Sequence, residues 1–247
     1  MGSLTRAVTS VLIPTPQDAT GIAALADPVR RRLYSFVSAQ SVAVSREQAA
    51  DAVGVPVHQA KFHLDKLEAE GLLASEYARL GGRRGPGAGR PAKLYRRCAR
   101  EISVSLPDRE YELAGQLMAD AIDGAAATGD SVIDTLYRLA TIRGRSIGQE
   151  AAAIQGEPDS PRAALSMAAA ALTRHGYEPR DVGGRVVLVN CPFHRLAQTH
   201  TQLVCGMNHA LISGLTSALE PHCPIAGLEP GSGRCCVVLR SGSPVTT

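Results

Sequence analysis

The 247-residue sequence predicts a mainly α-helical protein with small β elements, an α+β fold made of two parts. Apolar residues recur at helical spacing in segments that begin with capping residues and end near glycine. Short apolar runs between glycine-rich turns have the size of strands. Charge also divides the chain: residues 1–100 hold 15 Lys and Arg against 8 Asp and Glu, whereas residues 101–247 hold 11 against 15. Only the basic first part is therefore expected to meet a polyanion.

Composition limits the class of protein. A hydrophobic content of 45% is enough for two small cores in a chain of this length. No apolar run approaches the roughly 18–20 residues that span a bilayer, and the N-terminus lacks the pattern of a secretion signal. We therefore expect a cytoplasmic protein without membrane segments. In that reducing compartment, clustered cysteines are expected to be ligands or redox centres rather than disulfides.

The basic part begins with residues 1–20, which have no periodicity and are expected to form a flexible tail. The first helix is predicted to start at Asp27. Asp27 is suited to the N-cap position and Pro28 to the first helical position, and the helix then runs to Val37.

Two further helices follow in close succession. Ser45 and Gln48 form a capping-box pattern at the start of the second helix, and Gly54 is expected to end it. Pro56 opens the third helix, which is expected to stop at Gly71. Two short helices joined by a tight turn with glycine are typical of a helix-turn-helix.

The segments Leu72–Leu80 and Lys93–Arg97 suit two strands around a tip rich in Gly, Pro and Arg at residues 81–91. With the three helices, this hairpin predicts a winged helix-turn-helix DNA-binding domain over residues 21–100. Eight basic residues and no acidic one lie between Arg79 and Arg100, which favours contact with phosphates or a minor groove; a solvated loop is the alternative.

The third helix is expected to turn Ala60, Leu64 and Leu67 to the core and its polar residues to the major groove. Phe62 and His63 could equally be packing residues. The predicted DNA contacts of the helix and the wing are His58, Gln59, Lys61, His63, Arg83, Arg84, Arg90 and Lys93.

In the acidic part, a long helix over residues 108–127 is expected to link the domains within residues 101–130. Its apolar stripe at Leu113, Leu117 and Ile122 predicts pairing with a second subunit. A C-terminal α+β sensor domain is expected over residues 131–247. Its predicted helices cover 131–150, 160–175 and 192–219, the last broken near Gln202, and its predicted strands cover 177–182, 185–189, 225–228 and 235–240.

Five of the six cysteines fall in the last 57 residues, and four of them follow the spacing C-x13-C-x17-C-x11-C. Thiolates at several separated positions can jointly hold zinc or an iron-sulfur cluster. One buried cysteine is more often a core residue, and Cys98, alone near the wing, is expected to be one.

The local pattern sets conditions on a shared site. Cys191 ends a predicted strand, and Cys205 lies about three turns into the next helix, so both reach one site only if that helix breaks. Cys235 and Cys236 are expected on one strand with side chains on opposite faces, so that only one of them joins. Zinc stays an alternative because His194, His200, His209 and His222 lie in the same region.

Two sets of motifs resemble a known family. The run Ala60-Lys61-Phe62-His63-Leu64-Asp65-Lys66-Leu67 and the wing G-R-P-A-K-L-Y-R at residues 89–96 resemble winged helix-turn-helix regulators of the ArsR/DeoR type, especially the SufR-like iron-sulfur branch. The segments around Cys191, Cys205 and Cys235 are similar to the ligand-bearing segments of that branch.

The resemblance implies a cluster, 4Fe-4S in type, held by Cys191, Cys205, Cys223 and Cys235. The second and third spacings depart from the branch's pattern, and Cys236 is additional to it.

The sequence thus predicts a homodimeric bacterial transcription regulator whose affinity for double-stranded operator DNA depends on an iron-sulfur cluster. The alternatives are a zinc or thiol-redox sensor, and a regulator that binds a small apolar effector with its cysteines in the core. No catalytic motif such as G-x-S-x-G or H-E-x-x-H occurs, so an enzyme is not expected.

Overall fold

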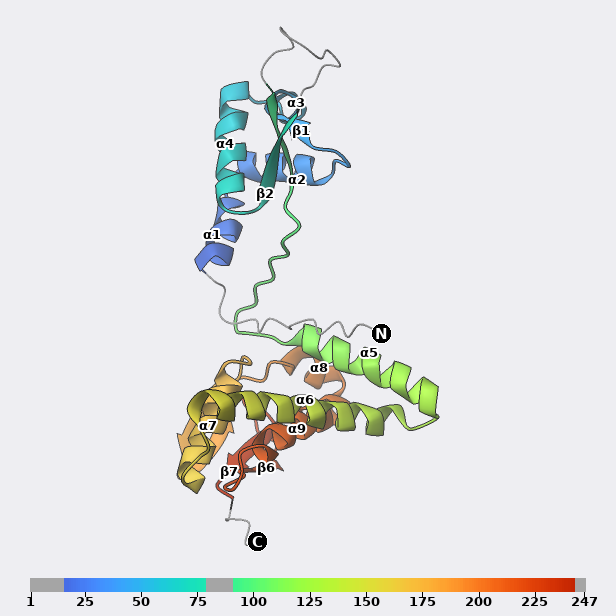
Figure 1. The fold of residues 1–247 in the computed structure, drawn as a ribbon, viewed down its shortest axis with the longest axis vertical. Coiled ribbons are helices and arrows are strands. Elements are labelled where there is room, and N and C mark those ends of the chain that lie inside the picture. Colours follow the sequence, from blue (N-terminus) through green and yellow to red (C-terminus); the bar gives the residue numbers. More distant parts are fainter. Residues whose placement is uncertain (1–15, 79–90, 243–247) are drawn as a thin grey trace. The chain divides into compact units, whose positions relative to one another are not determined.

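The computed structural model describes residues 16–78 and 91–242, which belong to two compact units (Figure 1). The boundary between the units falls after Val104. We call the described residues before it the head and those after it the body. Helices dominate both units, and each unit has a small antiparallel sheet, which confirms the predicted α+β class. Among the described helices, none is long and apolar enough to cross a membrane.

Capping signals fix the head helices that the sequence predicts. Asp27 accepts hydrogen bonds at 2.9 Å from the backbone amides of Val29 and Arg30. The capping box of Ser45 is complete, and Gly54 ends its helix in the left-handed conformation with φ 70°. The helices of the described head are α1 (Pro16–Ala24), α2 (Pro28–Ser38), α3 (Arg46–Val53) and α4 (Val57–Ala69).

Helix α1 begins inside residues 1–20, which were predicted to form a flexible tail. Residues 16–20 are helical, and Ala24 at the helix end is buried in the head core. Proline in the first turn and Asp18 beside it suit a helix N-terminus. The prediction is wrong here because nine residues of mostly small side chains carry no clear apolar stripe.

The sheet of the head pairs the wing strands, β2 (Leu73–Ala78) and β3 (Ala92–Arg97), in antiparallel register from Leu73 opposite Arg97 to Ala78 opposite Ala92. A two-residue strand that was not predicted, β1 (Val44–Ser45), pairs with the other edge of β3. Helices α2, α3 and α4 pack beside this sheet around buried Leu33, Leu64, Leu67 and Tyr95.

The helices of the described body carry its main core. They are α5 (Tyr111–Thr128), α6 (Val132–Gln155), α7 (Pro161–Thr173), α8 (His194–Thr199) and α9 (Thr201–Ser217). The break between α8 and α9 falls at His200, near the predicted position. Helices α6 and α9 lie against each other so closely that a Cβ added to Gly144 would stand 1.8 Å from the carbonyl oxygen of Leu211.

The sheet of the body has the order β4-β5-β7-β6, and every neighbouring pair is antiparallel. Cys191 follows strand β5 in the sequence, and Cys235 and Cys236 precede strand β7. The strands are β4 (Pro179–Val182), β5 (Arg185–Leu188), β6 (Ile225–Leu228) and β7 (Val237–Arg240).

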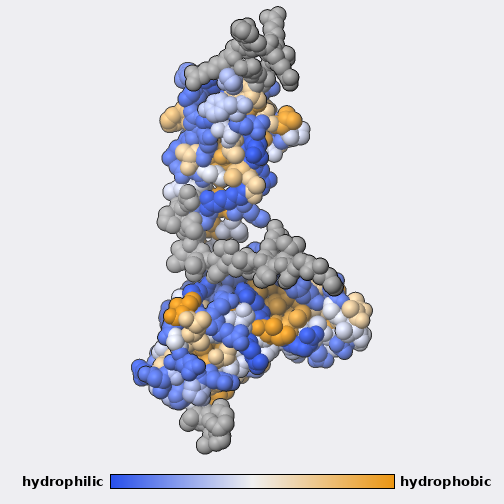
Figure 2. Space-filling view, viewed as in Figure 1, coloured by the Kyte–Doolittle hydropathy of each residue, from blue (hydrophilic) through white to orange (hydrophobic). Residues whose placement is uncertain are grey.

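The predicted subunit stripe on α5 does not form one exposed face. Leu113 and Leu117 are 8% and 6% exposed and belong to the body's own core, whereas Ile122 is 57% exposed. Ile142 on α6 is also exposed, and Figure 2 shows hydrophobic residues on the body surface in the region of α5 and α6. Leu113 and Leu117 therefore pack within the chain itself, and the subunit interface on α5 stays a prediction.

Candidate functional site

The predicted DNA-contacting residues of α4 divide by burial. His58 and Lys61 are exposed and Gln59 is half-buried, so all three side chains can be reached from solvent. Phe62 is also exposed. The three residues predicted to face the core are fully buried: Ala60, Leu64 and Leu67.

His63 is only 7% exposed, and its ring meets Phe62 edge-on with 5.2 Å between ring centroids. Its Nδ1 atom is buried without a hydrogen-bond partner in the described part of the chain. A ring that lies inside the head cannot reach a base edge, so the structure favours the packing alternative over the predicted DNA contact.

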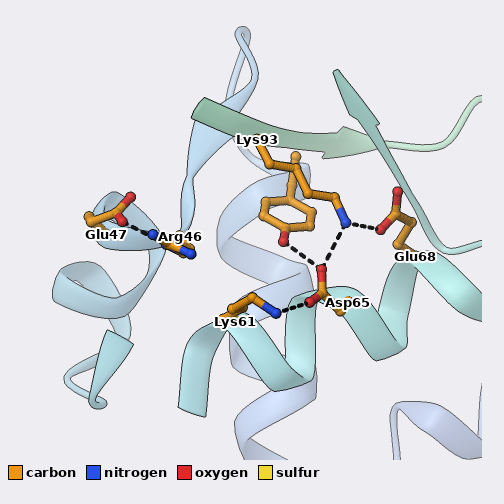
Figure 3. A network of polar contacts seen from close by, with 7 residues as sticks. Arg46, Glu47, Lys61, Asp65, Glu68 and Lys93 are labelled. Atoms are coloured by element: carbon orange, nitrogen blue, oxygen red, sulfur yellow. Dashed lines mark hydrogen bonds and ion pairs between the residues drawn. The ribbon is translucent and has the colours of Figure 1, made fainter. Parts of the chain in front are cut away.

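A network of charged groups joins α4 to the wing strand β3 (Figure 3). Asp65 accepts hydrogen bonds from Lys61 and Lys93, both at 2.8 Å, and from the Tyr95 hydroxyl at 2.7 Å. Lys93 also donates to Glu68 at 2.5 Å. The network therefore fixes the angle between the helix and the strand.

This network corrects the role predicted for Lys93. Its side chain is 28% exposed, and its ammonium group is shared between the carboxylates of Asp65 and Glu68. An ammonium neutralised in this way has little charge left for a phosphate, so Lys93 positions the wing strand. Lys61 has one carboxylate partner and is 53% exposed, which leaves it available to a further partner.

Asp65 is the centre of the network. Partial burial by itself would raise the pKa of Asp65, but hydrogen bonds from Lys61, Lys93 and Tyr95 outweigh it, so this pKa lies well below its ordinary value. The ionised carboxylate is thus part of the folded head at neutral pH.

We expect Asp65→Asn to lower the free energy of unfolding by about 1–3 kcal/mol at pH 7, because hydrogen bonds to charged groups are lost. The pKa of Asp65 is depressed in the folded state. Its stabilisation is therefore complete above the unfolded-state pKa of about 3.9 and is lost as pH falls from there towards the folded-state pKa.

The difference between wild type and Asp65→Asn should shrink between pH 7 and pH 3, measured by urea unfolding followed by circular dichroism. Glu76→Gln is the control, because Glu76 faces Arg96 at 3.7 Å in an exposed pair that is expected to contribute little. A difference that stays constant with pH would contradict this account.

The contacts predicted for the wing tip, Arg83, Arg84 and Arg90, lie outside the described residues. Beside the described base of the wing, a hollow of about 500 Å³ opens between α3, α4 and β3. Arg46, Lys61 and Tyr77 line it. The predicted DNA-facing side of α4 therefore continues into a concave and partly basic surface.

In the body, four thiols from separated segments come together. Cys191 follows β5, Cys205 lies on α9, and Cys235 and Cys236 precede β7. The thiol of Cys235 lies close enough to interact with those of Cys191 and Cys236, and the thiol of Cys236 also interacts with that of Cys205. The break at His200 separates α9 from α8, as the sequence required for Cys191 and Cys205 to share a site.

The placement of Cys235 and Cys236 differs from the prediction. Strand β7 begins only at Val237, and Cys236 lies in a bend. The alternation of a strand does not apply there, and the thiols of the two residues lie close enough to interact with each other. Both residues belong to the thiol group, whereas the sequence predicted that only one of them would join, and the family resemblance favoured Cys235.

The thiol group favours one negative charge at its centre. The neighbouring thiols of Cys191 and Cys236 lower the pKa of Cys235 below its ordinary value, and the Asn208 amide donates to its sulfur at 3.1 Å. The same interactions, together with burial, raise the pKa values of Cys191 and Cys236. Asn208 is itself fixed, because the buried Tyr177 hydroxyl donates to its side-chain oxygen.

Cys223 lies apart from this group. Its thiol donates to the carbonyl oxygen of Ser217 at 3.7 Å, and burial raises its pKa without any contribution from another thiol. Cys98 belongs to the head, where its amide donates to the Leu72 carbonyl. The predicted set of four is thus brought together except for Cys223.

Two histidines of this region, His194 and His209, contact groups other than the cysteine thiols. His209 contacts the Ala226 carbonyl oxygen at 3.1 Å, and His194 contacts Gln198. His222 has a buried Nδ1 atom without a hydrogen-bond partner in the described chain. Within residues 16–78 and 91–242, no group of three or more His, Cys, Asp or Glu side chains is arranged to hold a metal ion.

Comparison with known proteins bears on the head. Residues 25–76 match a family model described as a helix-turn-helix domain. Neither the curated proteins nor the solved structures give a significant match. The matched segment contains α2, α3, α4 and the start of β2, and β3 completes the wing. The head is therefore a winged helix-turn-helix domain, the kind of domain with which transcriptional regulators bind DNA.

Proposed function

We propose that this protein is a transcription regulator whose affinity for operator DNA is controlled by an iron-sulfur cluster bound in the body. The observation that carries the proposal is the meeting of four cysteine thiols from three separate segments, Cys191, Cys205 and the pair Cys235–Cys236. Cys191 and Cys235 are buried and Cys205 and Cys236 are half-buried, and thiols that meet from separated positions of a chain can jointly hold a metal centre.

The chemistry of these donors fits a cluster. Iron-sulfur clusters are held by cysteine thiolates, and four such side chains are available. Hydrogen bonds to Cys235 from Asn208 and from the backbone amide of Val237 already stabilise negative charge at this sulfur. In the described part of the chain these thiols are not yet arranged to hold a metal ion, so the site would have to rearrange on loading. When bound, a cluster supplies a centre that responds to oxidants and to iron supply.

The ligand set that we propose is Cys191, Cys205, Cys235 and Cys236. It differs in one member from the set that the family resemblance implies, in which Cys223 takes the fourth place. The thiol of Cys223 contacts the Ser217 carbonyl, whereas the thiol of Cys236 lies beside those of Cys205 and Cys235. The contacts of the thiols therefore support Cys236.

On the DNA side, we propose that His58, Gln59 and Lys61 of α4 contact base edges in the major groove. Arg83, Arg84 and Arg90 of the wing are proposed to neutralise phosphates, which would make binding strongly salt-dependent. Lys93 and Asp65 hold the wing strand at its angle to α4. We further propose a cytoplasmic homodimer, because two winged heads read half-sites about one helical turn of DNA apart.

The decisive experiment is anaerobic purification of the full chain, with iron and acid-labile sulfide measured per chain and a visible spectrum recorded. We expect a brown protein that contains both elements. DNA fragments selected from a random pool should bind with different affinities before and after cluster removal, in gel shifts at several salt concentrations.

Two results would overturn the proposal. Stoichiometric zinc without sulfide would support a zinc sensor instead. A colourless protein without metal, whose DNA affinity changes only with thiol oxidation, would support a thiol-redox regulator.

A further inference from the structure

The segment that carries Cys191 is tied to the start of α5. Asn190 is only 8% exposed, and its side-chain amide donates to the carbonyl oxygen of Asp108 at 3.2 Å and to that of Gly176. The backbone amide of Glu110 donates to the Pro192 carbonyl oxygen at 3.3 Å. Both neighbours of Cys191 in the chain therefore bond to residues 108–110, some 80 positions earlier.

Arg109 completes this connection with one nitrogen atom. Its Nη1 donates to the Asn190 side-chain oxygen at 2.5 Å, to the Cys191 carbonyl oxygen at 3.2 Å and to its own neighbour Asp108 at 3.1 Å. A guanidinium is always charged and rigidly planar, so it holds several acceptors in a fixed arrangement. The position of the Arg109 guanidinium group therefore depends directly on the backbone position of Cys191.

There is little free space around this connection. A Cβ added to Gly176 would lie 2.9 Å from the Cβ of Asp108, so the two backbone segments are nearly in contact. On the other side of Glu110, its carboxylate faces His175 at 3.5 Å. A shift of residues 190–192 is therefore expected to be passed on to residues 108–110.

Residues 108–110 occupy a special place in the chain. The head ends at Val104 and the body begins at Ser105, so the chain that leaves the head first meets the thiol segment at Asp108. The thiol of Cys191 lies beside that of Cys235, while its carbonyl oxygen accepts a hydrogen bond from Arg109. One residue is therefore shared by the thiol group and by the entry of the chain into the body.

We infer that Arg109 is a positioning residue that transmits the state of the thiol site to the head through residues 105–108. The inference rests on the proposed function and adds the route by which it is regulated. Loading the site rearranges the thiol group and displaces Cys191, Arg109 follows the Cys191 carbonyl, and the chain leading to the head moves with it.

The test compares Arg109→Gln with wild type, using operator fragments selected from random DNA. Gln keeps a polar side chain but lacks the charge and the reach to hold Asn190 and Cys191 together. Arg180→Gln on the exposed part of β4 is the matched control. For each protein we would measure iron and sulfide content, the visible spectrum, and DNA affinity before and after cluster removal.

For wild type and for Arg180→Gln we expect the two affinities to differ by about 5- to 150-fold, the usual range of coupling between sites. For Arg109→Gln we expect normal iron and sulfide but a ratio of less than about 2-fold. Arg109→Lys, which retains the charge and three donors, should restore part of the ratio.

A structural readout accompanies the affinities. Amide hydrogen exchange of residues 105–112 should change on cluster removal in wild type and stay constant in Arg109→Gln. A full affinity ratio in Arg109→Gln would overturn the inference, as would loss of iron from that variant, because Arg109 would then only support the ligands. Failure of the proposed function is seen separately, in a wild type without iron or with equal affinities, and in that case the inference falls with it.

Discussion

Cys236→Ser is expected to abolish or sharply reduce the iron and acid-labile sulfide of the purified protein, whereas Cys223→Ser is expected to retain both. The reason lies in the contacts of the two thiols. The thiol of Cys236 lies beside those of Cys235 and Cys205 in the thiol group, whereas the thiol of Cys223 donates to a backbone carbonyl at the end of α9. A cluster that loses one of its thiolates keeps an exposed iron and is readily lost.

The measurement is iron and sulfide per chain with the visible spectrum, made anaerobically on each variant. Cys191→Ser and Cys205→Ser should behave like Cys236→Ser, and Cys98→Ser in the head should behave like wild type. Circular dichroism must show that every variant is folded. If Cys223→Ser loses the chromophore and Cys236→Ser keeps it, the ligand set implied by the family resemblance is right and the set proposed from the thiol contacts is wrong.

The head could be predicted closely from sequence because its signals are local. Asp27, Ser45 and Gly54 each act on backbone groups within a few residues, so their effect does not depend on the rest of the fold. The roles of single charged residues were harder to predict. Lys93 counts as a basic residue in any sequence pattern, but its two carboxylate partners lie 25 and 28 positions earlier on α4.

In the body, prediction from the sequence was limited by contacts between distant parts of the chain. The break in the helix after Cys191 could be predicted from the sequence as a condition for a shared site. An unbroken helix would separate Cys191 from Cys205 by about three turns. The place of Cys236 could not be predicted, because it depends on where β7 begins. The amide of Cys235 donates to Leu188 on β5, and the carbonyl of Cys236 accepts from Glu229. These long-range bonds set the bend, and no local pattern encodes them.

The close contact of α6 and α9 could have been predicted from the sequence by two glycines on α6. The spacing of apolar residues alone did not indicate this contact. Gly144 and Gly148 are four residues apart on α6 and so share one face, where they meet Leu211 and Leu215 of α9. Small residues at this spacing let two helix backbones approach closely. The contact matters for function because Cys205 and Asn208 both lie on α9, which must stay seated for the thiol group to form.

Gly144→Ala is expected to destabilise the body by about 3 kcal/mol or more, because inserting atoms into a tightly packed contact commonly costs about 1–3 kcal/mol even where side chains can move. Here the added methyl group would stand 1.8 Å from the Leu211 carbonyl oxygen and 2.8 Å from its carbonyl carbon. These are backbone atoms within a helix and cannot rotate away. The gain of up to about 1 kcal/mol from better helix propensity is too small to compensate.

Gly115→Ala on α5 is the matched control, since its added methyl group would meet nothing within 4 Å. This substitution keeps the gain in helix propensity without the clash, so it should stabilise the protein by about 0.5–1 kcal/mol. Urea unfolding followed by circular dichroism measures both effects. Because a displaced α9 carries Cys205 away from Cys236, Gly144→Ala should also lose iron and sulfide, whereas Gly115→Ala should keep them. Equal stability of the two variants would mean that α6 and α9 are further apart than the structure has them.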